Sequence, residues 1–395
     1  MREGEAMLLD RSIRSLFPTE TASPPFEGLG ASDACEPVRR RSQGRTMWLL
    51  TRHDHVAAML RDPRFVRTQP GRYGAWSGTL DLLSGEDGNH HAFLRRLIAP
   101  ALAARQVHRL APRARSCAEN LLSAIQNRES VDLYREYCLP LAMTVTSWVT
   151  GFPTHLLPDN ARWTEDYLGT REWTVDDAAT SRARQAALVD AAITLRRERP
   201  GPDLVSELVA RCDQGELGQD DLRMLVASLH VTGHVKTAAQ LGATLLVLLL
   251  GPAETRLRNR APQVAAATVE EVLRLAPVPQ NTHPRLATED VSLGGARVRR
   301  GELVCGSIVT ANQDGRHATR GQEHATEHLT FGHGRHFCPG APLARLVLRV
   351  GVTTAMRSLA GLAHRVDRDG LAWLEGFFAR GLAGLPVTRV THGPR

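Results

Sequence analysis

Residues 331–340, FGHGRHFCPG, decide the fold, because they place a single cysteine, Cys338, between glycines and a helix-forming stretch. Residues 341–350 continue as that helix, so Cys338 is expected at its N-terminus. Glycines let the backbone approach a ligand closely, and the free N–H groups and dipole of a helix N-terminus favour a thiolate. The pattern indicates a metal ligand, although a lone cysteine is more often buried beside a turn.

The composition is that of a globular protein from a reducing compartment. The chain has 395 residues, 42% of them hydrophobic, which is enough to bury a substantial core, and no internal repeat divides it. Its six cysteines show no paired spacing, which argues against a disulfide framework or a zinc site. We expect a cytoplasmic protein.

Charge and hydropathy argue against a membrane or nucleic-acid partner. The first 17 residues carry charges throughout and contain no signal-peptide core, and the most apolar run, 241–250, is far shorter than the roughly 20 residues that span a bilayer. The net charge of +7 comes mostly from arginines spread along the chain, without a basic run interleaved with aromatic residues. A solvated basic surface with one patch for an acidic protein partner is expected instead.

Hydrophobic periodicity predicts a mainly helical chain with a small β region. A short strand at 47–51 leads into a helix at 54–60, and further short strands are expected at 291–293, 303–304 and 385–387. Amphipathic patterns predict the remaining helices at 91–105, 107–127, 132–150, 181–198, 219–250, 262–275 and 340–358.

The loop at 331–340 resembles the heme-binding loop of the cytochrome P450 family, Phe-Gly-x-Gly-x-His-x-Cys-x-Gly. Residues 343–345, Leu-Ala-Arg, continue the helix as in bacterial members, and the resemblance extends over residues 48–387. It implies the cytochrome P450 fold, a triangular helical prism, as a single domain over residues 1–395 with an irregular segment at 1–46.

The same resemblance implies heme b as the cofactor, with Cys338 as the thiolate ligand of its iron. Phe331, Gly332 and Gly340 are then loop residues that contact the heme. It also assigns four partners to the two heme propionates. His91 and Arg95 are one helical turn apart and face the same region, while Arg285 and His336 supply the rest. A surface cation remains the alternative for each of the four.

Glu271 and Arg274 match the family's Glu-x-x-Arg pair, whose implied role is to buttress the cysteine loop. In the family a third residue joins the pair from a Pro-Asp-Pro-x-x-Phe loop. The corresponding segment, residues 315–322, lacks that pattern, and His317 or Arg320 is left open as the substitute.

The central helix departs from the family where relatives carry an acid and a threonine that organise proton delivery to dioxygen. Here the acid is replaced by Val235 and the first threonine by Lys236, while Gly233 and Thr237 match. Either Lys236 faces the distal pocket, or the helix shifts so that Thr237 or Thr232 faces the iron. A lysine there can donate a proton, ligate iron or pair with a substrate carboxylate.

Aromatic residues gather in segments that face the substrate in the family, which favours a flat or aromatic ligand, with core packing an equal explanation for each. The substrate candidates are Tyr73, Trp76, Trp163, Tyr167, Trp173, Val278 with the residues that follow it to Thr282, Phe377 and Phe378.

The expected function is that of a heme-thiolate oxidoreductase, which acts on a small, aromatic secondary metabolite with O2 and external electrons by monooxygenation or oxidative coupling. Ferredoxin and ferredoxin reductase are the expected electron partners of a monomeric enzyme, with Arg335, Arg345 and Arg349 as the docking charges. Two alternatives stay open. One is a peroxide-driven or non-hydroxylating enzyme that couples phenols or indoles, and the other is a catalytically silent heme-binding sensor.

Overall fold

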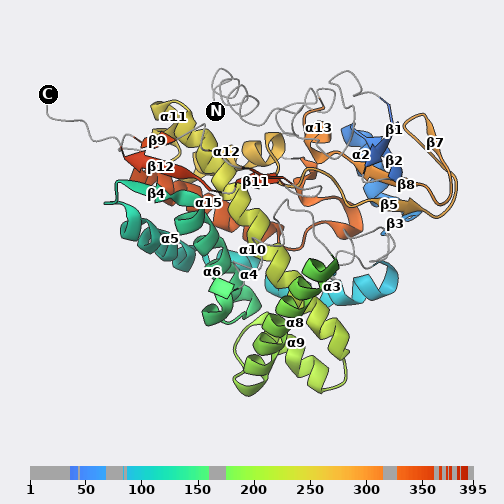
Figure 1. Ribbon diagram of the computed structural model, residues 1–395, viewed down its shortest axis with the longest axis horizontal. Coiled ribbons are helices and arrows are strands. Elements are labelled where there is room, and N and C mark those ends of the chain that lie inside the picture. The colour runs from blue at the N-terminus through green and yellow to red at the C-terminus, as the bar shows by residue number, and fades with distance from the viewer. Residues whose placement is uncertain are drawn as a thin grey trace.

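A computed structural model shows a large helical region with a five-stranded sheet at one end (Figure 1). It describes residues 36–42, 45–67, 83, 87–159, 175–314, 327–359, 364–366, 371, 373–375, 380–382 and 384–389. The expectation of a mainly α protein with a small β region is confirmed.

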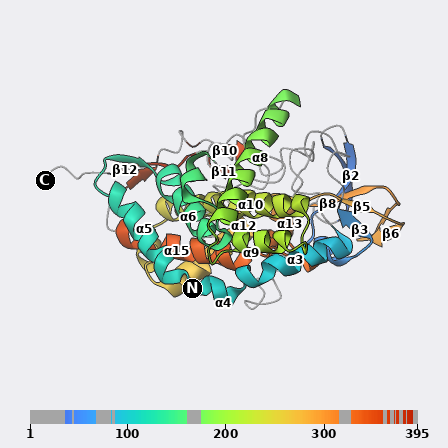
Figure 2. The same cartoon turned by 90° about the horizontal axis from the view of Figure 1, so that it is seen from below.

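Helix α10 (Gln219–Leu250) forms the centre of the helical region, as both views show (Figures 1 and 2). It packs against α6 (Leu139–Thr150), α8 (Val175–Glu198), α12 (Pro262–Leu275) and α15 (Ala341–Leu359). By length and composition α10 could cross a membrane, but 83% of its most apolar window is buried inside the protein, as in the core helix of a soluble protein.

The other helices surround this centre or cover the sheet. They are α2 (His53–Arg61), α3 (Gly88–Leu102), α4 (Ala104–His108), α5 (Ala111–Ile125), α9 (Leu204–Asp213), α11 (Ala253–Arg258) and α13 (Ile308–Asn312), with a π-helical turn at Tyr134–Cys138 and 3₁₀ turns at Thr154–Leu156, Leu329–Phe331 and Gly334–His336.

The five-stranded sheet has the order β1-β2-β8-β5-β3, with β2 and β8 parallel and the other pairs antiparallel. In the β3–β5 pair, Arg67 lies directly opposite Arg285. The strands of this sheet are β1 (Val38–Ser42), β2 (Arg45–Leu50), β3 (Phe65–Arg67), β5 (Arg285–Ala287) and β8 (Leu303–Gly306).

Smaller sheets flank the helical region and the main sheet. They consist of β4 (Ser130–Asp132), β12 (Pro386–Arg389) and β9 (His364–Val366) in that order, of β10 (Trp373–Glu375) with β11 (Arg380–Leu382), and of β6 (Val291–Leu293) with β7 (Ala296–Val298).

Several predicted boundaries are wrong for local reasons. The predicted helix at 107–127 is divided into α4 and α5, because a turn follows His108 and Pro112 begins the second helix. Part of the segment 1–46, which was expected to be irregular, forms β1. Its three consecutive arginines lack the alternation of apolar and polar residues that marks a strand in a sequence, and charged residues of this kind are common on edge strands. Helix α9 was not predicted; it begins at Asp203, whose carboxylate accepts a hydrogen bond from Ser206 N–H.

Candidate active site

A cavity of about 300 Å³ lies between α3, the middle of α10 and the loop that carries Cys338. Basic and imidazole side chains dominate its polar wall, and no aspartate or glutamate belongs to its lining among the described residues. The cavity is therefore strongly electropositive. Its basic and imidazole residues are Arg67, His91, Arg95, Lys236, His283, His333 and His336.

The cysteine loop is held by its own backbone. Cys338 N–H donates to Phe331 O at 2.8 Å, and Gly332 and Gly334 adopt positive φ angles of 74° and 68°. A Cβ on Gly334 would lie 2.9 Å from Leu60 O, so glycine is required at this contact with α2. Phe331, Gly332, Cys338 and Gly340 all line the cavity.

Burial raises the pKa of the Cys338 thiol, although the N–H groups of Gly340 and Ala341 and the charges of Lys236 and Arg95 act in the opposite direction. The donors that the sequence predicted to favour a thiolate, the N–H groups at the start of α15, are therefore in place. A bound metal ion deprotonates a coordinating thiol outright, so thiolate character at Cys338 would come with the metal.

His91 of α3 and His336 of the cysteine loop stack at the cavity with ring centroids 4.2 Å apart. Burial is the main cause that lowers the pKa of each to about 4, so both rings are neutral at physiological pH. Arg95 also lines the cavity, while its Nη2 donates to Phe337 O at 2.7 Å. A neutral imidazole carries one N–H, which His336 gives to Asp87, so His91 and Arg95 remain to donate to a carboxylate.

Asp87 holds Arg67, Arg335 and His336 together beside the cavity. It accepts a hydrogen bond from Arg67 N–H at 2.8 Å and pairs with Arg335 Nε at 2.9 Å, with His336 Nε2 at 3.3 Å. Burial raises the pKa of Asp87, but the hydrogen bonds from His336 and Arg67 N–H and the charge of Arg335 leave it well below its usual value. Asp87 is thus an anion already committed to protein donors.

Arg67 and Arg285 provide the test of whether the site fits a heme. They are cross-strand neighbours of like charge, an arrangement that destabilises a sheet unless an anion compensates it. Nε and Nη1 of Arg67 and Nε and Nη2 of Arg285 are buried without hydrogen-bond partners, and burial lowers the pKa of the two groups to about 9 and about 10. Buried unpaired donors of this kind fit the carboxylates of a heme, so the residues present fit the cofactor.

Arg67 is a candidate that sequence reasoning missed. Its segment carries no motif, and only the register of β3 against β5 brings it beside Arg285. His283 is a second one: it lines the cavity, and burial, followed by the charge of Arg67, lowers its pKa well below the usual value.

The middle of α10 brings Gly233, Lys236 and Thr237 to the cavity wall, while Val235 is buried outside the lining. Thr237 Oγ1 donates to Gly233 O at 3.1 Å, so its proton is committed to the helix. Gly233 is needed for the contact with α6, since a Cβ there would lie 2.8 Å from Thr146 Cγ2.

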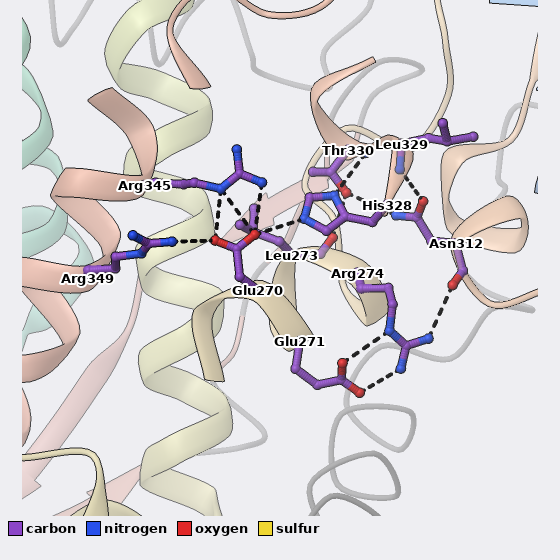
Figure 3. Close-up of polar contacts among 10 residues, drawn as sticks. All are labelled: Glu270, Glu271, Leu273, Arg274, Asn312, His328, Leu329, Thr330, Arg345 and Arg349. Carbon is purple, nitrogen blue, oxygen red and sulfur yellow. Dashed lines mark hydrogen bonds and ion pairs between the residues drawn. The ribbon is translucent and has the colours of Figure 1, made fainter. Parts of the chain in front are cut away.

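The Glu271–Arg274 pair belongs to a network behind the cysteine loop (Figure 3). Arg274 donates to both oxygens of Glu271, at 2.6 and 3.1 Å, and to Asn312 O at 3.2 Å. Asn312 in turn donates to Thr330 Oγ1 and accepts from Leu329 N–H. A main-chain carbonyl therefore completes the pair within the described residues, and His317 and Arg320 lie outside them.

The three arginines expected to dock a ferredoxin also have acidic partners within the protein. Arg335 pairs with Asp87, and Arg345 and Arg349 both pair with Glu270, which adjoins Glu271 on α12 (Figure 3). These contacts neutralise most of the charge on which that expectation depended.

The substrate candidates are placed only in part. In the expected segment 278–282, Pro279, Asn281 and Thr282 line the cavity. Val278 is buried and does not line it; its N–H donates to Gln240 and its C=O accepts from Arg380 N–H. The remaining candidates, Tyr73, Trp76, Trp163, Tyr167, Trp173, Phe377 and Phe378, lie outside the described residues.

Comparison with known proteins covers nearly the whole chain. A family model described as cytochrome P450 matches residues 263–362, from α12 to the end of α15. Nocardicin C N-oxygenase of Nocardia uniformis subsp. tsuyamanensis is 33% identical over 398 residues, which cover 94% of this chain and 99% of that protein. Mycinamicin IV hydroxylase/epoxidase of Micromonospora griseorubida is 34% identical over 372 residues, 91% of this chain and 94% of that one.

The fold is shared with solved structures as well. A myxobacterial cytochrome P450 in complex with myristic acid matches with a TM-score of 0.84 and 26% identity, over 97% of this chain and 99% of that chain.

Proposed function

The chain belongs to the cytochrome P450 family, and from that premise we propose that it oxidises a small secondary metabolite with electrons supplied by a ferredoxin. Members of the family bind heme b through a cysteine thiolate and act as monooxygenases. One observation carries the proposal for this chain: Cys338 shares a cavity with a set of cationic and imidazole donors that has no acidic lining among the described residues.

Each group has a definite task in this proposal. Heme held by a thiolate activates dioxygen, and the electron density of the sulfur favours O–O cleavage. Arg67 and Arg285 would donate their unpaired N–H groups to the heme carboxylates, together with Arg95 and the neutral ring of His91, while His336 holds Asp87 beside them. Glu271 and Arg274 hold the segment behind the loop, so that the cysteine keeps its position.

Electrons come from outside the chain in this proposal. Bacterial members typically use redox partners such as ferredoxin, which a reductase supplies, and we propose the same for this protein as a cytoplasmic monomer. An aromatic substrate remains a proposal that rests on the aromatic residues of the sequence alone.

A second candidate reaction follows from α10. The pair of residues that organises proton delivery in relatives is replaced by Val235, which is buried, and Lys236, which lines the cavity. Without that pair, oxidative coupling or N-oxygenation is favoured over simple hydroxylation, because the substrate's own O–H or N–H then supplies the hydrogen. The double variant Val235→Glu/Lys236→Thr tests it: an unchanged product and rate would favour the plain monooxygenase.

The central test is spectroscopic. The reduced carbon-monoxide complex should show the strongly red-shifted Soret band of thiolate ligation, and Cys338→Ala should lose it. A histidine-type spectrum in the wild-type protein would contradict the proposal. Multiple turnovers with ferredoxin, reductase and dioxygen would distinguish an enzyme from a silent heme-binding sensor, and turnover with peroxide alone would indicate the peroxide-driven alternative.

A further inference from the structure

Lys236 is a partly buried cation that lines the cavity, without a counter-charge in the described part of the chain. It lines the cavity from the middle of α10, and no hydrogen bond or ion pair joins its Nζ to a described residue. Burial lowers the pKa of Lys236, with the nearby Cys338 acting in the opposite direction. An ammonium group that lines a ligand cavity without a described protein partner is stabilised by an anion that arrives with the ligand.

The heme does not supply that partner. Its two carboxylates have donors in Arg67 and Arg95, which line the cavity, and in Arg285, which lies opposite Arg67 in the β3–β5 pair. Lys236 comes from a different element, α10, and the charge of a thiolate at Cys338 is balanced by the iron that it binds. One positive charge therefore remains on the α10 wall after the cofactor is accounted for.

The surroundings of Lys236 define what can bind there. Three hydroxyl groups near it on α10 and α6 are already donors to backbone carbonyls: Thr237 and Thr146 to Gly233 O, and Thr232 to Ser228 O. They face a ligand as acceptors, so Lys236 is the charged donor among the described α10 residues that line the cavity. Much of the remaining wall is apolar, contributed by Leu83, Ile98, Leu102, Leu229 and Ile308.

We propose that the substrate carries a carboxylate on an apolar body, and that Lys236 binds this carboxylate at the α10 wall. A lysine presents a single compact charge, which suits one carboxylate in an otherwise apolar chamber. The inference rests on the proposed function, since the substrate it describes is the one oxidised at this heme.

Binding to the ferric holoenzyme tests the proposal, with the spin-state change of the heme spectrum as the readout. The probes are saturated fatty acids from hexanoic to palmitic acid and phenylalkanoic acids, each compared with its primary amide. Wild-type protein should bind the preferred acid about tenfold more tightly than its amide, because a charge-assisted hydrogen bond replaces a neutral one. Lys236→Met should abolish this preference, and Lys236→Arg should keep most of it.

Arg105→Met is the matched control, because Arg105 is an exposed cation on α4 that does not line the cavity. It should leave the preference unchanged. A Lys236→Glu variant extends the test, since it should favour the corresponding primary amines over the acids.

Equal affinity of the wild type for acids and amides throughout the panel, including no binding of either, would overturn the inference, and so would a preference that survives Lys236→Met. A nitrogen-ligated ferric spectrum that disappears in Lys236→Met would also overturn it, because Lys236 would then bind the iron. In each of these cases a thiolate-type carbon-monoxide spectrum leaves the proposed function intact. If the wild type lacks that spectrum, the proposed function fails, and the inference fails with it.

Discussion

Glu270 of α12 and Arg345 of α15 form a bidentate ion pair, in which Arg345 Nε lies 2.8 Å from Oε1 and Nη2 lies 2.9 Å from Oε2 (Figure 3). Arg349 Nη2, at 3.0 Å, and His328 Nε2, at 3.3 Å, complete the shell of Glu270. Because α15 begins just after Cys338, this pair fixes the cysteine loop against α12.

Removal of the Glu270 charge should destabilise the protein. Glu270→Gln leaves Arg345 and Arg349 without their counter-charge, and we expect the free energy of unfolding to fall by about 2 kcal/mol, less than for a fully buried pair because Arg349 is half exposed. Denaturant unfolding measures it. The control is Glu254→Gln on α11, which is exposed and should change stability by less than about 0.5 kcal/mol. Equal effects of the two substitutions would refute the prediction.

Glu270 should also make the stability of the folded protein sensitive to acid. Burial raises the pKa of Glu270, but the hydrogen bonds from His328 and Arg345 lower it by more than burial raises it. The folded-state pKa of Glu270 therefore lies well below the ordinary 4.5. Its contribution to stability is therefore complete above about pH 4.5 and is lost as the pH falls below that value. The melting temperature of the wild type should drop more steeply than that of Glu270→Gln between about pH 5 and about pH 3. Parallel curves would mean that other carboxylates set the acid limit.

Arg67 should matter more for heme retention than for folding. In Arg67→Met the like-charge contact with Arg285 disappears, so the heme-free protein should be as stable as the wild type or more stable, while heme should transfer to apomyoglobin several-fold faster. Thermal unfolding and transfer kinetics give the two readouts. Arg105→Met is again the surface control, and heme transfer at the wild-type rate in Arg67→Met would remove Arg67 from the heme site.

Phe337 is expected to contact the electron donor. Its side chain, next to Cys338, is 42% exposed, and large apolar side chains with such exposure often mark interaction sites. Phe337→Ala should raise the KM for ferredoxin several-fold without changing substrate affinity. Leu257→Ala on α11 is the matched control, since Leu257 is 45% exposed near the other end of α15, where Arg260 Nε donates to Met356 O. A similar KM in both variants would indicate a different docking surface.

Features carried by short stretches of chain were predictable from the sequence. The glycines around Cys338, the i and i+3 spacing of Glu271 and Arg274, and the long apolar pattern of α10 each depend on residues close together, whose geometry follows from backbone dihedrals and helical periodicity. The replacement of the acid and threonine on α10 was also visible without a structure, because it alters a local motif.

Tertiary structure decided which distant charges meet. Arg67 lies opposite Arg285 only because β3 pairs with β5. Arg345 and Arg349 reach Glu270 only because α15 packs on α12. The surroundings of Cys338 are another feature that only the tertiary structure decides. Desolvation depends on everything that surrounds a group, and a local motif shows only the few donors next to it in the chain.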